Sequence, residues 1–357
     1  MAASAARLAP RDDVALMDGY HSPRVAVDVR LNVNESPLPP PLAFLEALAA
    51  EVAGVDWHRY PDRSATDLRA AIADLHGVAP EQVFVANGSN EVLQTLSLTY
   101  GGPGRTAAVF EPTYALHGHI ARITGTAVAE GERAEDLSLD LAEVRRVLTG
   151  TAPALTYLCS PNNPTGMVDA PDTVREVLAL APGLLVVDEA YGQFAPSSAL
   201  DLVDEDHPLV VTRTFSKTWS MAAARLGYCV APSWVVAELD KVVLPYHLDA
   251  LKQAAGRLAL GFVHEMEARV AHLTEERGRL EAALGDLPCE VWPSGANFIL
   301  FRPTSADGDR VWQALVDRSV LVRNCSSWPR LDGCLRVTVG TTDEDDRFLD
   351  ALREILT

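Results

Sequence analysis

Short apolar runs alternate with amphipathic or polar segments along the middle of the chain. Six of these runs predict strands: VFVA (83–86), AAVF (107–110), LTYLCS (155–160), LLVVD (184–188), VVTRT (210–214) and YCVA (228–231). Strands that are apolar at nearly every position are typical of a parallel sheet buried on both faces. The alternation therefore predicts an α/β fold, in which a mainly parallel central sheet is flanked by helices.

The pattern changes after residue 247. A long amphipathic stretch at 248–284 is followed by strand-like runs at 291–293, 297–301, 320–324 and 335–339, and by helical segments at 309–318 and 343–356. This order predicts a smaller α+β unit. The first 41 residues end in the proline-rich break SPLPPP and should form an arm that is part of the small unit. The expected domains are thus an arm at 1–41, a large domain at 42–247 and a small domain at 248–357.

The segment SATDLRAAIADLHG (64–77) carries signals for both ends of a helix. Ser64 is a residue type that caps helix N-termini, and Asp67 follows three residues later. Gly77 is the residue type that most often ends a helix in the left-handed conformation. Together these signals predict a helix from Ser64 to Gly77.

Charge narrows the range of partners. The 357-residue chain has 30 Lys and Arg against 49 Asp and Glu, a formal net charge of −19. Nucleic acids and anionic membranes attract basic surfaces, so neither is expected as a partner. No run of about 18 apolar residues could span a bilayer, and the start MAASAARLAPRDD lacks the apolar core of a signal peptide. We expect a soluble, cytoplasmic protein.

The five cysteines are scattered along the chain and predict neither disulfides nor a metal site. They are Cys159, Cys229, Cys289, Cys325 and Cys334. No pair has the spacing of a metal-binding motif such as Cys-x-x-Cys. Most lie in apolar runs, so buried thiols in a reducing compartment are the expected state, and no bound metal is predicted.

Candidate chemistry lies where predicted strands end, because parallel sheets place their ligands at the carboxyl ends of the strands. Asn87-Gly88-Ser89-Asn90-Glu91 follows the run at 83–86 and opens a helix. Free backbone N–H groups at a helix N-terminus can bind phosphate. Taken alone, such a turn is more often a simple helix cap.

Three further strand ends carry unusual residues: the loop CSPNNPTG (159–166), the carboxylate Asp188 at the end of an apolar run, and Lys217 with its neighbours Thr214, Ser216 and Arg225. Each has an ordinary structural explanation. The loop asparagines could be turn formers, Asp188 could belong to a structural ion pair, and Lys217 could be a surface lysine.

Together, these segments match the needs of one cofactor. Pyridoxal phosphate requires an amine that can attack its aldehyde, an acid partner for its ring nitrogen, donors to its phenolic oxygen and an anion site for its phosphate. Lys217 can supply the amine, Asp188 the acid partner, and hydroxyl groups with a guanidinium the phosphate site. The combination predicts a pyridoxal phosphate enzyme.

The chain resembles the fold-type I pyridoxal-phosphate aminotransferases of class I/II, and within them the histidinol-phosphate aminotransferases. The resemblance runs nearly end to end and in the family's order. Its motifs are LNVNESP (31–37), RYPD (59–62), NGSNE (87–91), EPTYALH (111–117), CSPNNPTG (159–166), VVDEAY (186–191), TFSKTWSMAAARLGY (214–228), PYHL (245–248), ANFIL (296–300) and LRVTVGT (335–341). The segment SSWPRLDG (326–333) departs from the family's pattern, which bears on pocket shape and substrate.

The resemblance implies roles for the residues that match the cofactor site. Lys217 would bind the cofactor covalently and, once freed, move the proton during transamination. Asp188 would pair with the ring nitrogen, and Asn163 and Tyr191 would hydrogen-bond the phenolic oxygen. Tyr114 would stack on the ring. The phosphate would be bound by Ser89, Asn90, Thr214, Ser216 and Arg225.

The resemblance also implies a substrate pocket and a second subunit. Arg336, with Arg323 near it, would bind the anionic group of the substrate. Tyr60 would reach the cofactor of the neighbouring subunit, which implies a homodimer. The pocket would be completed by Tyr20, Asn34, Asn297 and Tyr246. Tyr60 and Tyr246 could also be ordinary half-buried aromatic residues.

The implied reaction is amino transfer between glutamate and imidazole-acetol phosphate, which yields 2-oxoglutarate and histidinol phosphate in histidine biosynthesis. Two relatives of the same fold remain alternatives: an aromatic amino acid aminotransferase and a decarboxylase of a phosphorylated amino acid. A ligand-sensing module would need an attached DNA-binding segment, for which the chain has neither spare length nor a basic region. An NAD-dependent enzyme is disfavoured because no Gly-x-Gly-x-x-Gly follows the first strand.

Overall fold

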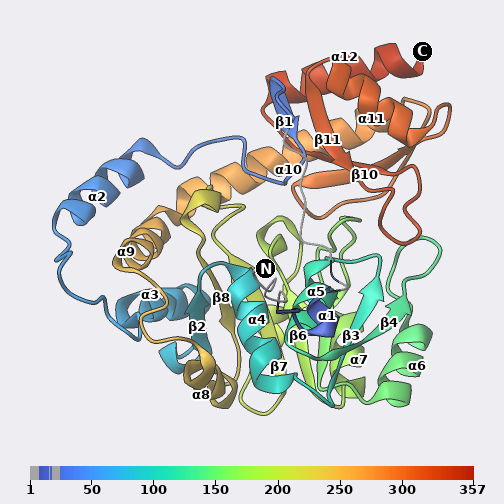
Figure 1. The fold of residues 1–357 in the computed structure, drawn as a ribbon. Coiled ribbons are helices and arrows are strands. Elements are labelled where there is room, and N and C mark those ends of the chain that lie inside the picture. Colours follow the sequence, from blue (N-terminus) through green and yellow to red (C-terminus); the bar gives the residue numbers. More distant parts are fainter. Residues whose placement is uncertain (1–7, 16, 18–24) are drawn as a thin grey trace, which may run out of the picture.

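The computed structural model describes residues 8–15, 17 and 25–357. Its strands form two separate sheets, one of seven strands and one of five. Figure 1 shows the five-stranded sheet with α11 (Gly308–Asp317) and α12 (Thr342–Leu356) at one end of the molecule, and the seven-stranded sheet at the other. Helix α10 (Val263–Gly285) runs along the five-stranded sheet. Tyr20 lies outside the described residues.

The larger sheet has the order β2-β8-β7-β6-β5-β3-β4. Its strands are β2 (Val83–Ala86), β3 (Thr106–Glu111), β4 (Ala127–Glu132), β5 (Leu155–Cys159), β6 (Leu184–Asp188), β7 (Leu209–Thr214) and β8 (Gly227–Val230). Only β8 runs antiparallel to its neighbours. All six predicted strands are present, and the sheet is mainly parallel, as the apolar runs predict. Strand β4 is not predicted by the apolar runs, because it is an edge strand in which polar and small residues are mostly exposed.

Helices bury both faces of this sheet, which explains why its strands are apolar on both sides. One face packs against α4 (Ser89–Tyr100), α5 (Leu116–Ile123) and α8 (Ser233–Val242). The other face packs against α6 (Leu141–Thr151) and α7 (Pro171–Leu180). The fold is therefore the predicted α/β architecture.

The helix predicted from Ser64 begins later than expected. Helix α3 spans Thr66–His76 and ends at Gly77, which has the predicted left-handed conformation, with φ of +66°. Its N-terminus is closed by Asp62, whose carboxylate oxygens accept hydrogen bonds from the N–H groups of Ser64 (2.9 Å) and Thr66 (2.6 Å). Two backbone donors favour the charged carboxylate and lower the pKa of Asp62.

The smaller sheet has the order β1-β11-β12-β10-β9. Its strands are β1 (Val29–Leu31), β9 (Cys289–Val291), β10 (Phe298–Pro303), β11 (Val320–Asn324) and β12 (Leu335–Thr338). Strand β1 comes from the N-terminal arm and pairs in parallel with β11. The arm thus adds a strand to this sheet, whereas the domain boundaries at residues 41 and 247 stay a prediction.

Three further helices complete the described chain. They are α1 (Asp12–Ala15), α2 (Leu42–Ala53) and α9 (Ala250–Ala259). The amphipathic stretch at 248–284 is not one helix, because a short 3₁₀ turn at Leu260–Phe262 separates α9 from α10. Residues 32–36, which directly follow β1, run from the smaller sheet to the carboxyl ends of β6 and β7, where Asn34 contacts Tyr191 and Val33 contacts Lys217.

Candidate active site

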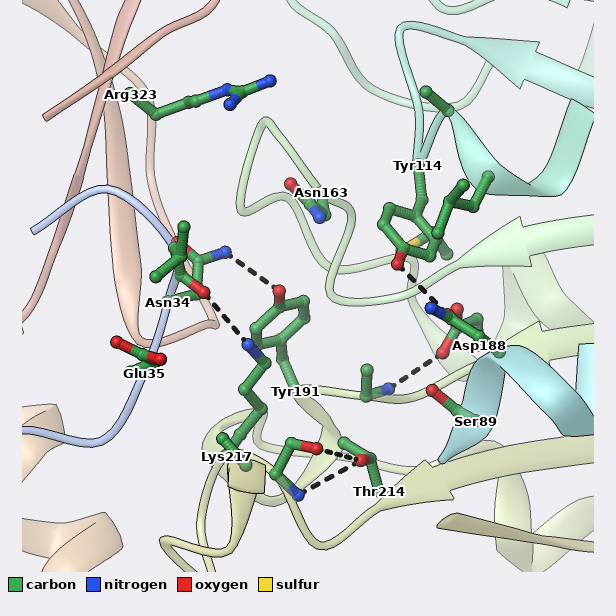
Figure 2. Close-up of a pocket in the computed structure, with 18 of the residues that line it drawn as sticks. Asn34, Glu35, Ser89, Tyr114, Asn163, Asp188, Tyr191, Thr214, Lys217 and Arg323 are labelled. Atoms are coloured by element: carbon green, nitrogen blue, oxygen red, sulfur yellow. Dashed lines mark hydrogen bonds between the residues drawn. The ribbon is translucent and has the colours of Figure 1, made fainter. Parts of the chain in front are cut away.

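The carboxyl ends of the larger sheet and the facing edge of the smaller sheet enclose one cavity of about 420 Å³. Figure 2 shows Asp188 and Thr214 at strand ends, and Lys217, Tyr191 and Asn163 on the segments that follow the strands. Thirteen of the residues predicted from the sequence line this cavity: Asn34, Ser89, Asn90, Tyr114, Asn163, Asp188, Tyr191, Thr214, Ser216, Lys217, Arg225, Arg323 and Arg336.

Lys217 lies just after β7, and its amine is held inside the cavity. Nζ donates a hydrogen bond to the carbonyl of Val33 (3.2 Å) and lies 5.7 Å from the centre of the Tyr191 ring. Burial, with the positive charges of Arg336 and Arg225 nearby, lowers the pKa of Lys217 to about 7. The amine is therefore neutral in a large fraction of molecules at neutral pH, which is the form that attacks an aldehyde.

Asp188 ends β6 and is almost fully buried, with 1% of its surface exposed. Its Oδ1 accepts hydrogen bonds from the Thr212 hydroxyl (3.0 Å) and the Ala190 N–H (3.1 Å). Its Oδ2 lies 3.1 Å from Nε2 of His117. The carboxylate is thus fixed in orientation by three groups, as an acid partner for a ring nitrogen must be.

No role is predicted for His117 from the sequence, although the residue stands in the motif EPTYALH. Its ring is buried, stacks on Tyr157 at 5.0 Å and meets Tyr114 edge-on at 5.4 Å. His117 lies three residues after Tyr114, and its N–H donates to the Tyr114 carbonyl (3.0 Å) where the chain enters α5. This spacing could have indicated that the two side chains lie close together. Thr212 lies two residues before Thr214 and therefore on the same face of β7, which could have indicated that it also lies near the site.

A closely packed turn forms where the N-terminus of α4 meets Arg225, in the loop after β7. Gly88 has φ of +84°, and a Cβ placed there would lie 2.7 Å from Nη2 of Arg225. Gly227 is also closely packed, since a Cβ added there would clash with the backbone nitrogen of Ser89. These two glycines let the guanidinium and the N-terminus of α4 approach each other.

The hydroxyl groups of the loop complete this turn. Thr214 Oγ1 donates to Ser216 Oγ (3.0 Å), and Arg225 Nη1 donates to Ser216 Oγ (3.2 Å). No carboxylate of the described residues pairs with Arg225. A cation without a counter-ion, beside a helix N-terminus and two hydroxyls, favours a bound anion such as phosphate.

On the opposite wall, Arg336 of β12 is buried with 5% of its surface exposed. It donates to the carbonyl of Asn32 (3.1 Å) and to Oδ1 of Asn163. Among the described residues, no carboxylate pairs with this guanidinium either. It is placed to bind a planar anionic group of a ligand.

Tyr191 and Tyr114 border the same cavity. The Tyr191 hydroxyl accepts a hydrogen bond from Nδ2 of Asn34 (2.9 Å), and burial raises the pKa of Tyr191 to about 12. The phenol therefore stays protonated and can donate to a ligand oxygen. The Tyr114 hydroxyl donates to Oδ1 of Asn90 (3.1 Å), which fixes the ring at the side of the cavity.

Three of the predicted residues that the structure describes do not line the cavity. Asn297 is buried beneath it and donates to the carbonyl of Asn34 (3.3 Å), so it supports a lining residue instead. Tyr60 and Tyr246 stack on each other at 4.5 Å and are 79% and 41% exposed. Tyr246 therefore does not line the cavity within a single chain, and its place in the pocket stays a prediction. Residues that line the cavity but were not predicted include Asn32, Glu35 and Trp328.

Among the described residues, no helix combines the length and apolar character needed to cross a bilayer.

Comparison with known proteins places this architecture in a family. Residues 26–352 match the family model described as aminotransferase class I and II. A histidinol-phosphate aminotransferase of Frankia casuarinae is 43% identical, over 97% of this chain and 90% of that protein. One of Corynebacterium diphtheriae is 41% identical, over 97% of this chain and 96% of that protein.

Solved structures agree on the fold. The histidinol-phosphate aminotransferase of Sinorhizobium meliloti, solved in complex with pyridoxal-5'-phosphate, superposes with a TM-score of 0.88 at 23% identity, covering 99% of this chain and 98% of that one. With its end-to-end family match and its relatives above 40% identity, the chain belongs to the class I and II aminotransferases.

Proposed function

We propose that the protein is a pyridoxal-phosphate-dependent histidinol-phosphate aminotransferase of histidine biosynthesis. It transfers an amino group between glutamate and imidazole-acetol phosphate, with 2-oxoglutarate and histidinol phosphate as the other pair. One observation carries this proposal. The amine of Lys217, with its pKa lowered to about 7, shares one cavity with the buried carboxylate of Asp188 and with three arginines that lack carboxylate partners among the described residues.

The donor set of the cavity fits pyridoxal phosphate. The turn around Gly88, where an added Cβ would meet Arg225, leaves room for a phosphate beside Ser89, Asn90, Thr214, Ser216 and Arg225. Asp188 would bind the protonated ring nitrogen, Asn163 and Tyr191 the phenolic oxygen, and Tyr114 one face of the ring. When bound, the cofactor supplies a ring that accepts the electrons left on the substrate carbon after proton removal.

The residues of the chain then perform the acid–base and positioning steps. Lys217 would hold the cofactor through Nζ. With Nζ free and neutral, it would accept the proton from the substrate carbon and return it to the carbon of the cofactor that bears the amino group at the end of the first half-reaction. Asp188, held by His117 and Thr212, keeps the ring nitrogen protonated. Tyr191 stays protonated and donates its hydroxyl hydrogen.

Two arginines explain how one pocket serves two different amino compounds. Glutamate has an α-carboxylate, whereas histidinol phosphate has a phosphate ester in its place. A guanidinium donates two parallel hydrogen bonds and can bind either group, so Arg336 serves both substrates in turn. Arg323 lies at the same cavity and would take a second anionic group or share the phosphate.

A homodimer and a cytoplasmic location are part of the proposal. Tyr60 and Tyr246 form an exposed stacked pair, and exposed aromatic residues of this kind are typical of protein interfaces. In a homodimer, Tyr60 would leave its own subunit and reach the phosphate of the other cofactor. The net charge of −19 and the small-molecule substrates are consistent with a cytoplasmic enzyme.

Absorbance of the purified protein tests the proposal. The protein should be yellow, glutamate should bleach the colour, and imidazole-acetol phosphate should restore it. Lys217→Ala should abolish turnover, because no other lysine among the described residues lines the cavity. A yellow protein that is restored only by phenylpyruvate would retain the cofactor but contradict the proposed substrate. A colourless protein that binds no pyridoxal phosphate would contradict the whole proposal.

A further inference from the structure

Arg323 is an uncompensated cation at the cavity. Within the described part of the chain, no carboxylate, carbonyl or hydroxyl accepts a hydrogen bond from its guanidinium. The guanidinium instead makes a cation–π contact with the Trp328 ring, whose centre lies 5.1 Å from Cζ of Arg323. Figure 2 shows the Arg323 side chain extending toward the side of the pocket where Asn163 lies. The aromatic face of Trp328 is therefore what holds this arginine.

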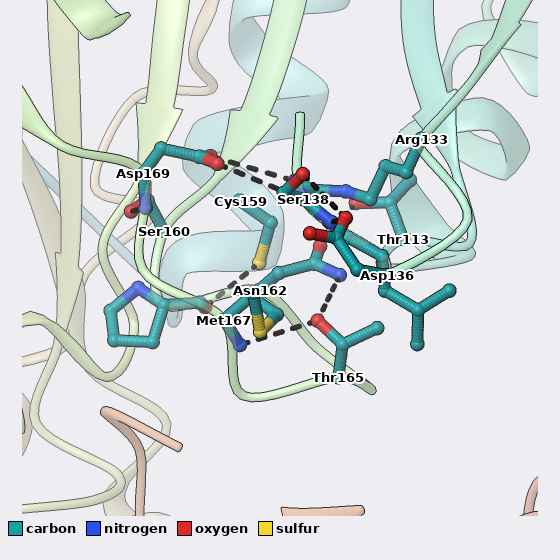
Figure 3. Close-up of polar contacts among 12 residues, drawn as sticks. Thr113, Arg133, Asp136, Ser138, Cys159, Ser160, Asn162, Thr165, Met167 and Asp169 are labelled. Carbon is teal, nitrogen blue, oxygen red and sulfur yellow. Dashed lines mark hydrogen bonds and ion pairs between the residues drawn. The ribbon is translucent and has the colours of Figure 1, made fainter. Parts of the chain in front are cut away.

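Trp328 is itself hydrogen-bonded to the side of the pocket that the larger sheet forms. Its indole N–H donates to the carbonyl of Thr113 (3.3 Å), the residue before Tyr114. The Thr113 hydroxyl in turn donates to Oδ1 of the fully buried Asn162 (2.9 Å), next to Asn163. Figure 3 shows Thr113, Asn162 and Thr165 in this group of polar contacts. The ring is thus tied to the loops that carry two predicted cofactor contacts.

The segment that carries Trp328 is fixed at its ends and at its tip. It leaves β11 and returns to β12, and the Cys325 N–H donates to the Cys334 carbonyl (2.9 Å) at its base. The guanidinium of Arg330 donates to the carbonyls of Ala134 (3.0 Å) and Arg133 on the larger sheet's side. Trp328 therefore presents a rigid face, and this segment is the one that departs from the family's pattern.

We propose that Trp328 is a positioning residue that holds Arg323 toward the cavity and so tunes the affinity for the phosphate of the substrate. A long arginine side chain loses rotamer freedom when it binds an anion, and prior fixation on an aromatic face reduces that loss. This inference rests on the proposed function and extends it by one residue that contacts no reacting atom.

Steady-state kinetics of the holoenzyme with histidinol phosphate test the inference. Trp328→Leu should raise the KM for histidinol phosphate by about 3- to 30-fold, the range expected for a lost cation–π contact, and change kcat less than about twofold. Trp328→Phe, which retains a ring face, should restore most of the affinity. Trp234→Leu is the matched control, since Trp234 is an exposed tryptophan whose N–H also donates to a carbonyl. It should leave the KM unchanged.

Two further measurements separate positioning from a general distortion of the pocket. In an Arg323→Gln background, Trp328→Leu should add less than about a twofold change, because the two residues act as one unit. Histidinol, which lacks the phosphate, should inhibit wild type and Trp328→Leu equally. An unchanged KM in Trp328→Leu, or an equal loss in the Arg323→Gln background, would overturn the inference.

If Trp328→Leu does not fold, Trp328→Gln decides the question, because it keeps an N–H donor for Thr113 but removes the ring. A wild-type enzyme that is inactive toward histidinol phosphate would contradict the proposed function and leave the inference about Trp328 to a second probe.

That probe is inorganic phosphate, used as a competitive inhibitor of any amino donor that the holoenzyme accepts. Its inhibition constant should rise by about 3- to 30-fold in Trp328→Leu and not in Trp234→Leu. Equal constants in both variants would overturn the inference.

Discussion

Lys217 illustrates how position changes the chemistry of a single residue. The same side chain on the surface would be a hydrated cation, as in the exposed Lys241, which pairs with Glu238; the half-buried Lys252 pairs with Asp249. Lys217 instead follows a buried strand and shares its cavity with Arg225 and Arg336, so its charged form is disfavoured. The neutral amine is then available near pH 7.

Competitive acetylation of the cofactor-free protein should report this directly. Labelling of Lys217, measured by mass spectrometry between pH 5 and 10, should rise with a midpoint near pH 7, because only the neutral amine reacts and the pKa of Lys217 is lowered to about 7. Lys241 in the same digest corrects for reagent decay. A midpoint near the ordinary lysine value of about 10.4 would show that burial does not disfavour the charge.

At the scale of elements, the βα turn at the start of α4 is the most constrained part of the site. Two glycines bring α4, Arg225 and the start of β8 within contact distance, and neither has room for a Cβ. By contrast, Gly278 lies inside α10, and an added Cβ there would meet nothing within 4 Å. An alanine should therefore disturb the turn at Gly88 and be tolerated at Gly278.

Gly88→Ala should weaken the binding of pyridoxal phosphate by about 10- to 100-fold, as expected when one charge-assisted hydrogen bond of about 1.5–3 kcal/mol is lost. Gly278→Ala should leave that affinity unchanged and raise the free energy of unfolding by about 0.5–1 kcal/mol. Absorbance titration of the cofactor-free protein and urea unfolding measure the two quantities. Normal cofactor affinity in Gly88→Ala would argue against phosphate binding at this turn.

At the scale of the whole molecule, the two sheets meet at the cavity and residues from both ends of the chain build it. Asn34 contacts Tyr191, and Arg336 contacts Asn32 and Asn163. The buried carboxyl of Asp345, in the first turn of α12, makes the stability of the protein depend on pH. Its Oδ1 accepts from the Gly340 N–H (2.9 Å), whereas its buried Oδ2 has no partner among the described residues.

Burial raises the pKa of Asp345 to about 7 from an ordinary value of 3.8. Between these values the folded state binds a proton that the unfolded state lacks, so this residue makes stability fall as the pH rises from about 4 to 7. Asp345→Asn should be more stable than wild type at pH 8, by on the order of 1–4 kcal/mol, with the gain disappearing near pH 4. Urea unfolding at several pH values measures this. Asp343→Asn, at an exposed position in the same helical turn, should show no such trend.

The proposed dimer predicts that two impaired variants recover activity when their subunits are mixed. If Tyr60 serves the partner's cofactor, Lys217→Ala and Tyr60→Ala each impair every site of their own homodimers. A mixed dimer of the two variants contains one site with both residues intact. Mixing the variants under conditions of subunit exchange should therefore restore activity, up to about a quarter of the wild-type value per total subunit. Mass spectrometry measures whether subunits exchange. If they exchange and no activity is recovered, the role of Tyr60 is contradicted.

The strands and most of the cavity could be predicted from the sequence, because buried strands are apolar at nearly every position and their last residues carry the chemistry. Strands β1 and β4 were missed, since β1 has only three residues and β4 is a largely exposed edge strand. The start of α3 was misplaced because Ser64 and Asp62 are both cap-forming residues, and only the fold selects Asp62. His117 was missed because a histidine without metal spacing gives no signal by itself.

The sequence alone determined the α/β fold, the family and thirteen of the residues that line the cavity, because each depends on local patterns and on motifs read in order. Only the tertiary structure decided which groups orient Asp188 and that Asn297 donates to Asn34. It also decided that Tyr60 and Tyr246 stack outside the cavity of their own chain, and that the Trp328 ring contacts Arg323. These are contacts between segments far apart in the chain. Their distances depend on how the two sheets pack, and no local pattern encodes that packing.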